Sequence, residues 1–216
     1  MVPVHVFERP MPYRRYIQYA DLLRKHRSEN IVFCEHRPTI TLGIQTKPES
    51  LLTEPASLSK QGVEVVAVKR GGDATAHEPG QIIVYPHIDL KQRQIKLSDF
   101  VSGIIDITGR VIESMFQLKL VPNPDAPGLY NTDGEKVVSM GIEIKKAFSS
   151  SGIAINYTND LNTFSFIHPC GYHDLKMASI YPGQSVEKKN DPKLQTKKKE
   201  FCKLWAGQFI QLFSLY

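Results

Sequence analysis

Residues 63–85 read Val63-Glu-Val-Val-Ala-Val-Lys-Arg70-Gly-Gly-Asp-Ala-Thr-Ala-His-Glu-Pro-Gly80-Gln-Ile-Ile-Val-Tyr85. The β-branched run at 63–68 and the apolar run at 81–85 predict two strands, joined by a glycine-rich turn. Paired glycines permit positive φ and close approach of a ligand to the backbone. The stretch has neither the Gly-Lys-Ser/Thr of a phosphate-binding loop nor the Gly-x-Gly-x-x-Gly of a dinucleotide fold. We therefore predict a turn that holds a carboxyl or thioester oxygen, with a tight structural turn as the alternative.

Extended and turn patterns continue on both sides of this stretch. Asp133-Gly134 is a hairpin signal between short apolar runs, and the serine run with its glycine at 149–152 is expected to be a loop. Further strand patterns lie at 31–34, 39–42, 128–130, 136–138, 141–145 and 153–156.

Three segments have the helical spacing of apolar residues. The first covers about 13–27, the second follows Ser98 as N-cap and runs to about Phe116, and the third covers about 200–216. Helices and strands without a regular βαβ series predict an α/β (α+β) fold, with a single domain and a mixed β-sheet flanked by helices. The predicted core faces of the three helices are Tyr16, Ala20 and Leu23; Phe100, Ile104, Ile107, Val111 and Met115; and Phe201, Leu204, Trp205, Phe209 and Leu212.

The net charge of +5 is concentrated in one late segment. Residues 183–199 are polar and basic, which predicts a flexible connector. We find no RRM, KH or helix-turn-helix signature, so no nucleic-acid partner is expected. The lysines either steer acidic protein partners or form a solvated face. They are Lys188, Lys189, Lys193, Lys197, Lys198, Lys199 and Lys203.

The cysteines and the hydropathy pattern indicate a cytoplasmic protein. Cys34, Cys170 and Cys202 match no metal-site or disulfide spacing. No segment approaches the roughly 20 apolar residues that span a bilayer. We therefore predict reduced thiols, no metal and no membrane association.

Local context favours one cysteine as a nucleophile. Cys170 stands between proline and glycine, in a bend expected to expose the thiol. Cys34 lies within an apolar run, and Cys202 lies beside an apolar helical stripe. Lys136 opens an apolar strand, where a lysine alone is more often an edge residue than a functional one.

Several motifs, in this order, resemble the lipoyl(octanoyl) transferase family. They are Glu35-His-x-Pro38, Arg70-Gly-Gly-x-x-Thr75, His77, Pro79-Gly-Gln81, Ala126-Pro-Gly-Leu-Tyr130, Lys136-Val-Val-x-x-Gly141, Gly152-x-Ala-x-Asn156 and Pro169-Cys-Gly171. The resemblance runs from about residue 14 to residue 182, and the motifs are highly specific as a set. It implies a fold of the biotin/lipoyl protein ligase type.

Three positions depart from the family's pattern. Ala76 stands where the family has tyrosine, Glu78 where it has glycine, and Ser151 where it has histidine. These changes affect the expected lining and surroundings of the site, and hence the acyl-chain preference and the rate. They leave Cys170 and Lys136 in place.

The resemblance implies transfer of an octanoyl group from octanoyl-acyl carrier protein to a lysine of a lipoyl-accepting domain. The implied acceptors are the lipoyl domains of 2-oxoacid dehydrogenases and the glycine cleavage H protein. No cofactor is expected, because the donor thioester is already activated. The implied catalytic residues are Cys170 and Lys136. The implied substrate-binding residues are Arg70, Gly71, Gly72, Asp73, Ala74, Thr75, Ala76, His77, Gly80, Ser139, Met140, Gly141, Gly152, Ile153, Ala154 and Gly171.

The implied catalytic pair is chemically reasonable. A free cysteine is only a few per cent thiolate at pH 7. An ammonium about 4 Å away favours the thiolate by roughly 4 kcal/mol at an effective dielectric near 20. Lys136 would protonate the departing carrier thiol and later help deprotonate the acceptor amine. Backbone N–H groups near Gly71–Gly72 or Gly171 are the expected oxyanion donors.

The roles of other polar residues stay open at this point. His77 orients a pocket residue, contacts the substrate or is structural, and Arg70 braces the turn or pairs with a partner's carboxylate. Weaker site candidates are Glu35, His36, His168 and His173.

Three other functions compete with octanoyl transfer. An ATP-dependent lipoate–protein ligase would use a lysine and would not need Cys170. A lipoyl amidotransferase would also act through a cysteine, but its pattern fits less well. A non-catalytic lipoyl-domain binding protein would have no need of both Cys170 and Lys136.

Overall fold

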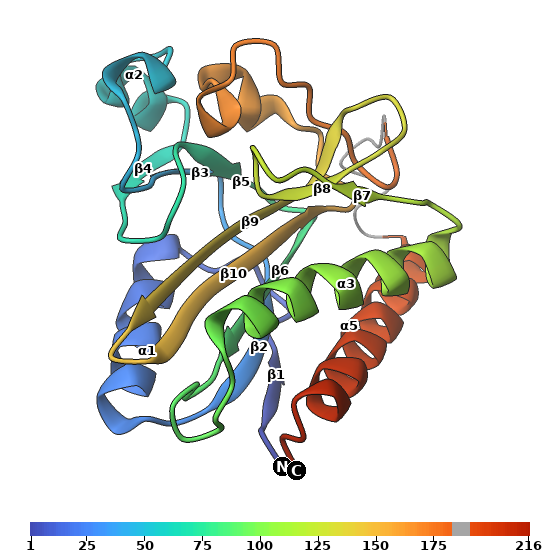
Figure 1. Ribbon diagram of the computed structural model, residues 1–216. Coiled ribbons are helices and arrows are strands. Elements are labelled where there is room, and N and C mark those ends of the chain that lie inside the picture. Colours follow the sequence, from blue (N-terminus) through green and yellow to red (C-terminus); the bar gives the residue numbers. More distant parts are fainter. Residues whose placement is uncertain (183–190) are drawn as a thin grey trace.

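The computed structural model describes residues 1–182 and 191–216, and the chain forms two β-sheets in these ranges (Figure 1). The pairs of the larger sheet are antiparallel except for the parallel pair β1–β2. The expectation of a mixed sheet is therefore confirmed. In spatial order its seven strands are β1 (Val4–Val6), β2 (Asn30–Cys34), β6 (Gln81–His87), β10 (Phe148–Asn156), β9 (Lys136–Lys145), β8 (Gly128–Tyr130) and β7 (Val121–Pro122).

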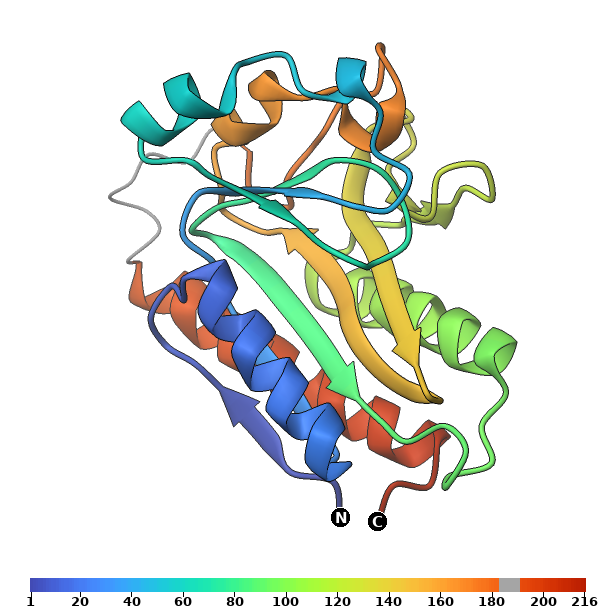
Figure 2. The same cartoon turned by 90° about the vertical axis from the view of Figure 1, so that its left-hand side faces the viewer.

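Helices cover both faces of this sheet (Figures 1 and 2). Helix α1 (Tyr13–His26) packs on one face, and α3 (Leu97–Phe116) and α5 (Pro192–Leu212) pack on the other. The alternation of side chains along β2 explains both contacts, because Ile31 and Phe33 join the core under α3 and α5. The alternate residues Val32 and Cys34 point to the other face and join the core under α1.

The smaller sheet lies at one end of the larger one (Figure 1). Its central strand β3 (Thr39–Leu42) pairs in parallel with β4 (Glu64–Ala67) and antiparallel with β5 (Thr75–His77). The prediction of one turn between residues 70 and 80 is therefore wrong: the glycine-rich turn at residues 70–74 connects β4 to β5 within the small sheet, and residues 78–80 connect β5 to β6 of the large one. Short helices complete this end, namely α2 (Pro55–Lys60), η1 (Pro48–Ser50), η2 (Asn162–Phe166) and η3 (Pro169–Gly171).

Helix α5 begins earlier than the sequence predicts. Its first turn starts at Pro192, and the side chain of Asp191 caps it by accepting a hydrogen bond of 2.8 Å from the Lys193 N–H. The prediction of a connector over 192–199 is therefore wrong, and residues 183–190 of that prediction lie outside the described ranges. Leu204 and Leu212, predicted as core, are 39% and 50% exposed.

Two further local predictions are wrong. Ser98 is not the N-cap of α3, because the helix begins at Leu97 after Lys96. Residues 149–152 are not a loop but part of β10. The serine run is polar, which is why the sequence favours a loop, but the buried Ser149 hydroxyl is satisfied within the sheet, because it donates to Pro86 O at 2.6 Å and accepts from Ile88 N at 2.8 Å.

The ends of the chain lie side by side (Figure 1). The Val2 N–H donates to Leu215 O at 2.9 Å, and both side chains are buried. In the part of the chain that the structure describes, no helix combines the length and apolarity that a bilayer crossing requires.

Candidate active site

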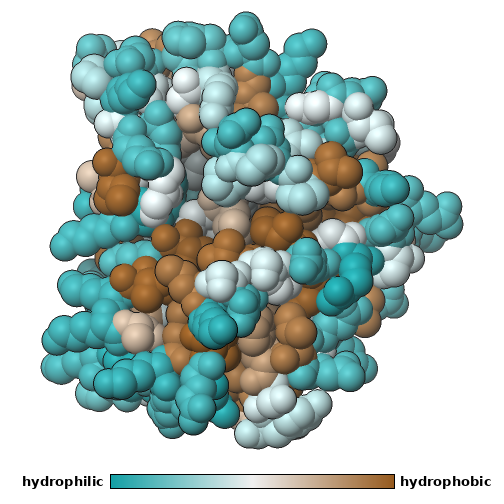
Figure 3. All heavy atoms as spheres, in the orientation of Figure 1, coloured by the Kyte–Doolittle hydropathy of each residue, from teal (hydrophilic) through white to brown (hydrophobic). Residues whose placement is uncertain are grey.

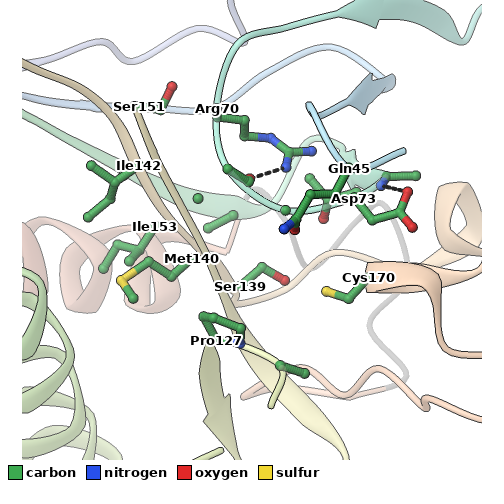
Figure 4. A pocket seen from close by; sticks show the side chains of 18 of the residues that line it. Gln45, Arg70, Asp73, Pro127, Ser139, Met140, Ile142, Ser151, Ile153 and Cys170 are labelled. Carbon is green, nitrogen blue, oxygen red and sulfur yellow. Dashed lines mark hydrogen bonds between the residues drawn. The ribbon is translucent and has the colours of Figure 1, made fainter. Parts of the chain in front are cut away.

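A cavity of about 390 Å³ lies between the glycine-rich turn, the β9–β10 hairpin and residues 125–127 (Figure 4). Met140, Ile142 and Ile153 give part of it an apolar wall, and Arg70, Asp73 and Cys170 bring polar groups to another part. On the outer surface, Figure 3 shows a band of apolar side chains across the face that carries β9 and α3 in Figure 1. The cavity is therefore suited to a ligand with an apolar chain and a polar reacting end.

Cys170 and Lys136 meet at this cavity although they are 34 positions apart. The Lys136 Nζ lies 3.0 Å from the Cys170 Sγ and 3.4 Å from Ala126 O. Lys136 is fully buried, whereas Cys170 is half-buried and lines the cavity. An ammonium in contact with a sulfur in a shielded site is the arrangement that activates a cysteine nucleophile.

The backbone around Cys170 holds the thiol in one place. Cys170 has φ of 58° and Gly171 has φ of 77°, both in the left-handed region. The Cys170 N–H donates to Ala74 O at 3.2 Å, which ties this bend to the glycine-rich turn. A Cβ at Gly171 would lie 2.6 Å from Asp73 Oδ2, so only glycine fits against that carboxylate.

Asp73 supports the same bend from the other side. Its Oδ2 accepts a hydrogen bond of 2.8 Å from the Ser50 hydroxyl, and its Oδ1 accepts one of 2.6 Å from the Ala74 N–H. The His168 N–H, just before the bend, donates to Ser50 O. Asp73 therefore joins η1, the turn and η3 around the thiol.

Gly128 makes room for the buried lysine. A Cβ at this position would lie 2.6 Å from Lys136 Cε and 2.1 Å from Val138 O. Gly128 also has φ of 149°, which disfavours other residues. The Ala126-to-Tyr130 motif thus positions the lysine stem, and the Lys136 Nζ lies 5.4 Å from the centre of the Tyr130 ring.

Arg70 braces the turn. Its guanidinium donates to Thr41 O at 2.9 Å, to Thr41 Oγ1 at 2.8 Å and to Gly71 O at 3.0 Å. Burial lowers the pKa of Arg70. A Cβ at Gly141 would lie 2.8 Å from Arg70 Cδ, which explains glycine there. These contacts favour the bracing role over pairing with a partner's carboxylate.

Buried histidines and tyrosines form the cavity floor on the α1 side. His77 stacks on Tyr13 with ring centres 5.4 Å apart, and its Nδ1 lies 3.2 Å from Gln81 Oε1. Burial lowers the pKa of His77 well below its usual value. The His36 Nε2 lies 2.9 Å from the Tyr85 hydroxyl, and burial lowers the pKa of His36 to about 4. Both imidazoles are therefore neutral at pH 7; His77 lines the cavity, and His36 lies beneath it.

Most of the predicted site residues line the cavity. Lys136 itself does not line the cavity, but its Nζ contacts Cys170, which does. The predicted residues that line it are Arg70, Gly71, Gly72, Asp73, Ala74, Thr75, His77, Ser139, Met140, Gly141, Gly152, Ile153, Ala154 and Cys170.

Ala76, Gly80 and Gly171 do not line this cavity. Ala76 lies on β5 between Thr75 and His77, so its side chain points to the opposite face and packs with Phe164 and Ile167. Gly80 instead donates its N–H to Glu35 Oε2 at 2.7 Å.

Glu78 serves the loop after β10 rather than the cavity. Its Oε1 accepts hydrogen bonds of 2.8 Å from Asn159 Nδ2 and 2.7 Å from Leu161 N, and its Oε2 accepts one of 3.1 Å from Thr163 N. The glutamate at this departure from the family's pattern therefore stabilises the loop that follows β10.

Ten further residues line the cavity and are not among the predicted site residues. Ala126 and Pro127 belong to the Ala126-to-Tyr130 motif, Ser151 is one of the three departures from the family's pattern, and Ile142 follows Gly141 on β9. The other six are brought here by the fold. The ten are Tyr13, Gln45, Tyr85, Val101, Asp125, Ala126, Pro127, Ile142, Ser151 and Tyr172.

The weaker candidates take structural or peripheral positions. Glu35 forms a buried ion pair with Lys198 of α5, and His36 lies under the floor. His168 and His173 flank the Cys170 bend with ring centres 4.0 Å apart and do not line the cavity. Among residues 1–182 and 191–216, no three His, Cys, Asp or Glu side chains are arranged to hold a metal ion.

Comparison with solved structures shows the fold. A bipartite lipoate protein ligase from Thermoplasma acidophilum superposes with a TM-score of 0.65 at 14% identity, covering 99% of this chain and 92% of that one. A biotin acetyl coenzyme A carboxylase synthetase from Helicobacter pylori gives a TM-score of 0.54 at 9% identity, covering 99% of this chain and 74% of that one. The expected biotin/lipoyl protein ligase-like fold is confirmed.

Comparison of sequences shows the family. An octanoyltransferase from Leptospira interrogans is 42% identical over 176 residues, which are 81% of this chain and 82% of that protein. An octanoyltransferase from Shewanella loihica is 32% identical over 182 residues, which are 83% and 80% of the two chains. The family model of the lipoyl protein ligase A/B catalytic domain matches residues 13–189. This chain belongs to the lipoyl protein ligase A/B catalytic domain family.

Proposed function

We propose that this protein is an octanoyltransferase that acts through a cysteine thioester. The observation that carries the proposal is the 3.0 Å contact between Lys136 Nζ and Cys170 Sγ at the cavity wall. The relatives named octanoyltransferase support the same activity. The donor in this proposal is octanoyl-acyl carrier protein, and the acceptor is a lysine of a lipoyl domain or of the glycine cleavage H protein.

The first half-reaction loads the enzyme. The Cys170 thiolate attacks the carbonyl carbon of the carrier thioester, and the carbon–sulfur bond to the carrier breaks. Lys136 transfers a proton to the departing carrier sulfur. The products are the free carrier thiol, octanoyl-Cys170 and a neutral Lys136 amine.

The second half-reaction forms the amide. The free amine of the acceptor lysine attacks the octanoyl-Cys170 carbonyl, and Lys136 takes the proton that the amine loses. The Cys170 thiolate leaves as the carbon–sulfur bond breaks. The ammonium–thiolate pair is thereby restored for the next cycle, and no ATP is consumed.

The oxyanion donor that we favour is the Gly72 N–H. The Gly71 N–H donates to Ile142 O and the Gly171 N–H donates to His168 O, so both are already used. Gly72 lines the cavity, and its φ of 86° lies in the left-handed region that glycine adopts freely. A fixed N–H at a developing negative charge stabilises the tetrahedral intermediate of acyl transfer.

The cavity and the surface charge also support this reaction. The apolar lining by Val101, Met140, Ile142 and Ile153 suits an acyl chain. Exposed lysines on α5, including Lys193 and Lys203, suit an acidic carrier or acceptor. Lys198 does not contribute to such steering, because it is buried in its ion pair with Glu35. A thiol nucleophile acts in its reduced form, and the cytosol keeps thiols reduced, so we propose a cytoplasmic location.

The ATP-dependent ligase is the second candidate, because solved lipoate ligases share this fold. A ligase passes through an acyl-adenylate and has no use for a thiol in contact with its lysine. The contact between Cys170 and Lys136 therefore favours the transferase.

The decisive experiment is intact-mass measurement after incubation with octanoyl-carrier protein in the absence of ATP. The wild-type protein should gain the mass of one octanoyl group, and Cys170→Ala should gain none. Cys202→Ala is the matched control and should load like wild type, since Cys202 is buried in the α5 core. Failure of wild type to load, combined with transfer that needs free acid and ATP, would establish the ligase instead.

A further inference from the structure

A second cavity, of about 250 Å³, adjoins the first on the α1 side of the β9–β10 hairpin. Tyr16, Ile17 and Ala20 of α1 and Val68 after β4 give it an apolar part. Charged residues complete the lining: Asp21, Lys69 and Lys145 are exposed, and Arg24 lies 3.9 Å from Glu143, each with a side chain 20% exposed. The two cavities share two lining residues, Tyr13 and Ser151.

Tyr13 and Ser151 therefore form the wall between the cavities. Tyr13 is 2% exposed and stacks on His77, so its ring is fixed in place. Ser151 is held through its backbone, because its N–H donates to the Tyr16 hydroxyl at 2.9 Å. Ser151 thus has the smaller of the two side chains in the wall, and Figure 4 shows it at the end of the cavity away from Cys170.

We infer that Ser151 sets the length of acyl chain that the enzyme accepts, with the second cavity receiving the end of a chain longer than octanoyl. The inference rests on the proposed transfer through Cys170. The reacting carbonyl is fixed at Cys170, so added methylenes extend away from it, toward the Ser151 end. The apolar contacts offered beyond the wall by Ile17, Ala20 and Val68 are those that methylenes require.

The backbone at Ser151 allows a clean pair of variants. Its φ is 63°, a left-handed conformation that glycine adopts freely and asparagine tolerates better than most residues. Ser151→Gly removes the side chain from the wall, and Ser151→Asn enlarges it, both without new backbone strain. Ser214→Gly is the matched control, because Ser214 has φ of 49° and lines neither cavity.

The experiment measures the rate of acyl-Cys170 formation with hexanoyl, octanoyl, decanoyl and dodecanoyl carrier protein. One buried methylene improves binding about fourfold. Ser151→Gly should therefore raise the decanoyl-to-octanoyl rate ratio about tenfold, and Ser151→Asn should shift the preference toward hexanoyl. Ser214→Gly should keep the wild-type ratios.

The result that overturns the inference is an unchanged length profile in both Ser151 variants while each still loads Cys170 and melts near the wild-type temperature. Absence of acyl-Cys170 in wild type with every donor is a separate result. It would remove the proposed function itself, and this inference with it.

Discussion

At the scale of single residues, the most unusual group is the buried ammonium of Lys136. A fully buried lysine is costly unless its charge is paired. Here the partners are the Cys170 sulfur, Ala126 O and the face of Tyr130. Gly128 supplies the space for the lysine stem. These contacts hold the Lys136 amine beside Cys170, where the proposed proton transfer requires it.

Two substitutions of Lys136 distinguish the effect of its positive charge from its proposed role in proton transfer. Lys136→Met should slow acyl-enzyme formation by about 10²–10⁴-fold, because the general acid is lost. Lys136→Arg keeps a positive charge but cannot release a proton near neutral pH, so it should not restore the second half-reaction. Rapid-quench measurement of both half-reactions distinguishes the two variants. Wild-type loading by Lys136→Met would contradict the proposed role.

The sequence located Cys170 and Lys136 but could not show how they meet. Their motifs identified both residues, whereas the 3.0 Å contact depends on pairing of strands and loops far apart in the chain. The prediction that Ala76 binds substrate is wrong, because a sequence motif does not show toward which face of a strand each side chain points. The alternation of side chains along β5 turns Ala76 away from the cavity that Thr75 and His77 line. The sequence likewise does not show whether the Glu78 side chain enters the cavity.

At the scale of elements, α5 is anchored by one buried ion pair. Lys198 donates to Glu35 Oε1, and Glu35 Oε2 accepts the Gly80 N–H at 2.7 Å. The neighbouring Lys199 pairs with Glu8 on the surface, where both side chains are mostly exposed. The lysine run predicts a polar connector, because the sequence alone does not show that the Lys198 side chain is buried while its neighbours are exposed.

These adjacent lysines form a matched pair for mutation. Lys198→Met should destabilise the protein by about 3 kcal/mol, since it leaves Glu35 buried without its partner. Lys199→Met should change stability by less than about 1 kcal/mol, because an exposed pair contributes little. Urea unfolding of both variants provides the comparison. Equal effects would mean that the Glu35 pair does not anchor α5.

At the scale of the whole molecule, buried neutral histidines make stability depend on pH. Burial lowers the pKa of His36 and of His87 to about 4, whereas an unfolded histidine titrates near 6.5. Between these values the unfolded chain binds more protons than the folded protein. Stability is therefore fully present above about pH 6.5 and is lost as the pH falls toward 4.

A single substitution should reduce this dependence. Each of these two histidines contributes up to about 3 kcal/mol of the loss by pH 4. His87→Phe removes one titrating ring and keeps an aromatic side chain next to Phe148. Thermal unfolding between pH 7 and pH 4 should show a smaller fall in midpoint for His87→Phe than for wild type. Parallel curves for the two proteins would show that His87 does not titrate on unfolding.

The contact between the two ends of the chain, Val2 with Leu215, makes the backbone almost a closed ring. A short glycine–serine linker could join residues 1 and 216 without crossing the catalytic cavity. New ends could then be opened at the exposed turn of residues 91–94, which connects β6 to α3. Such a circular permutant would keep every catalytic contact while changing the order in which the two halves leave the ribosome. A tag fused at residue 1 or at residue 216 likewise projects from the same corner of the molecule (Figure 1).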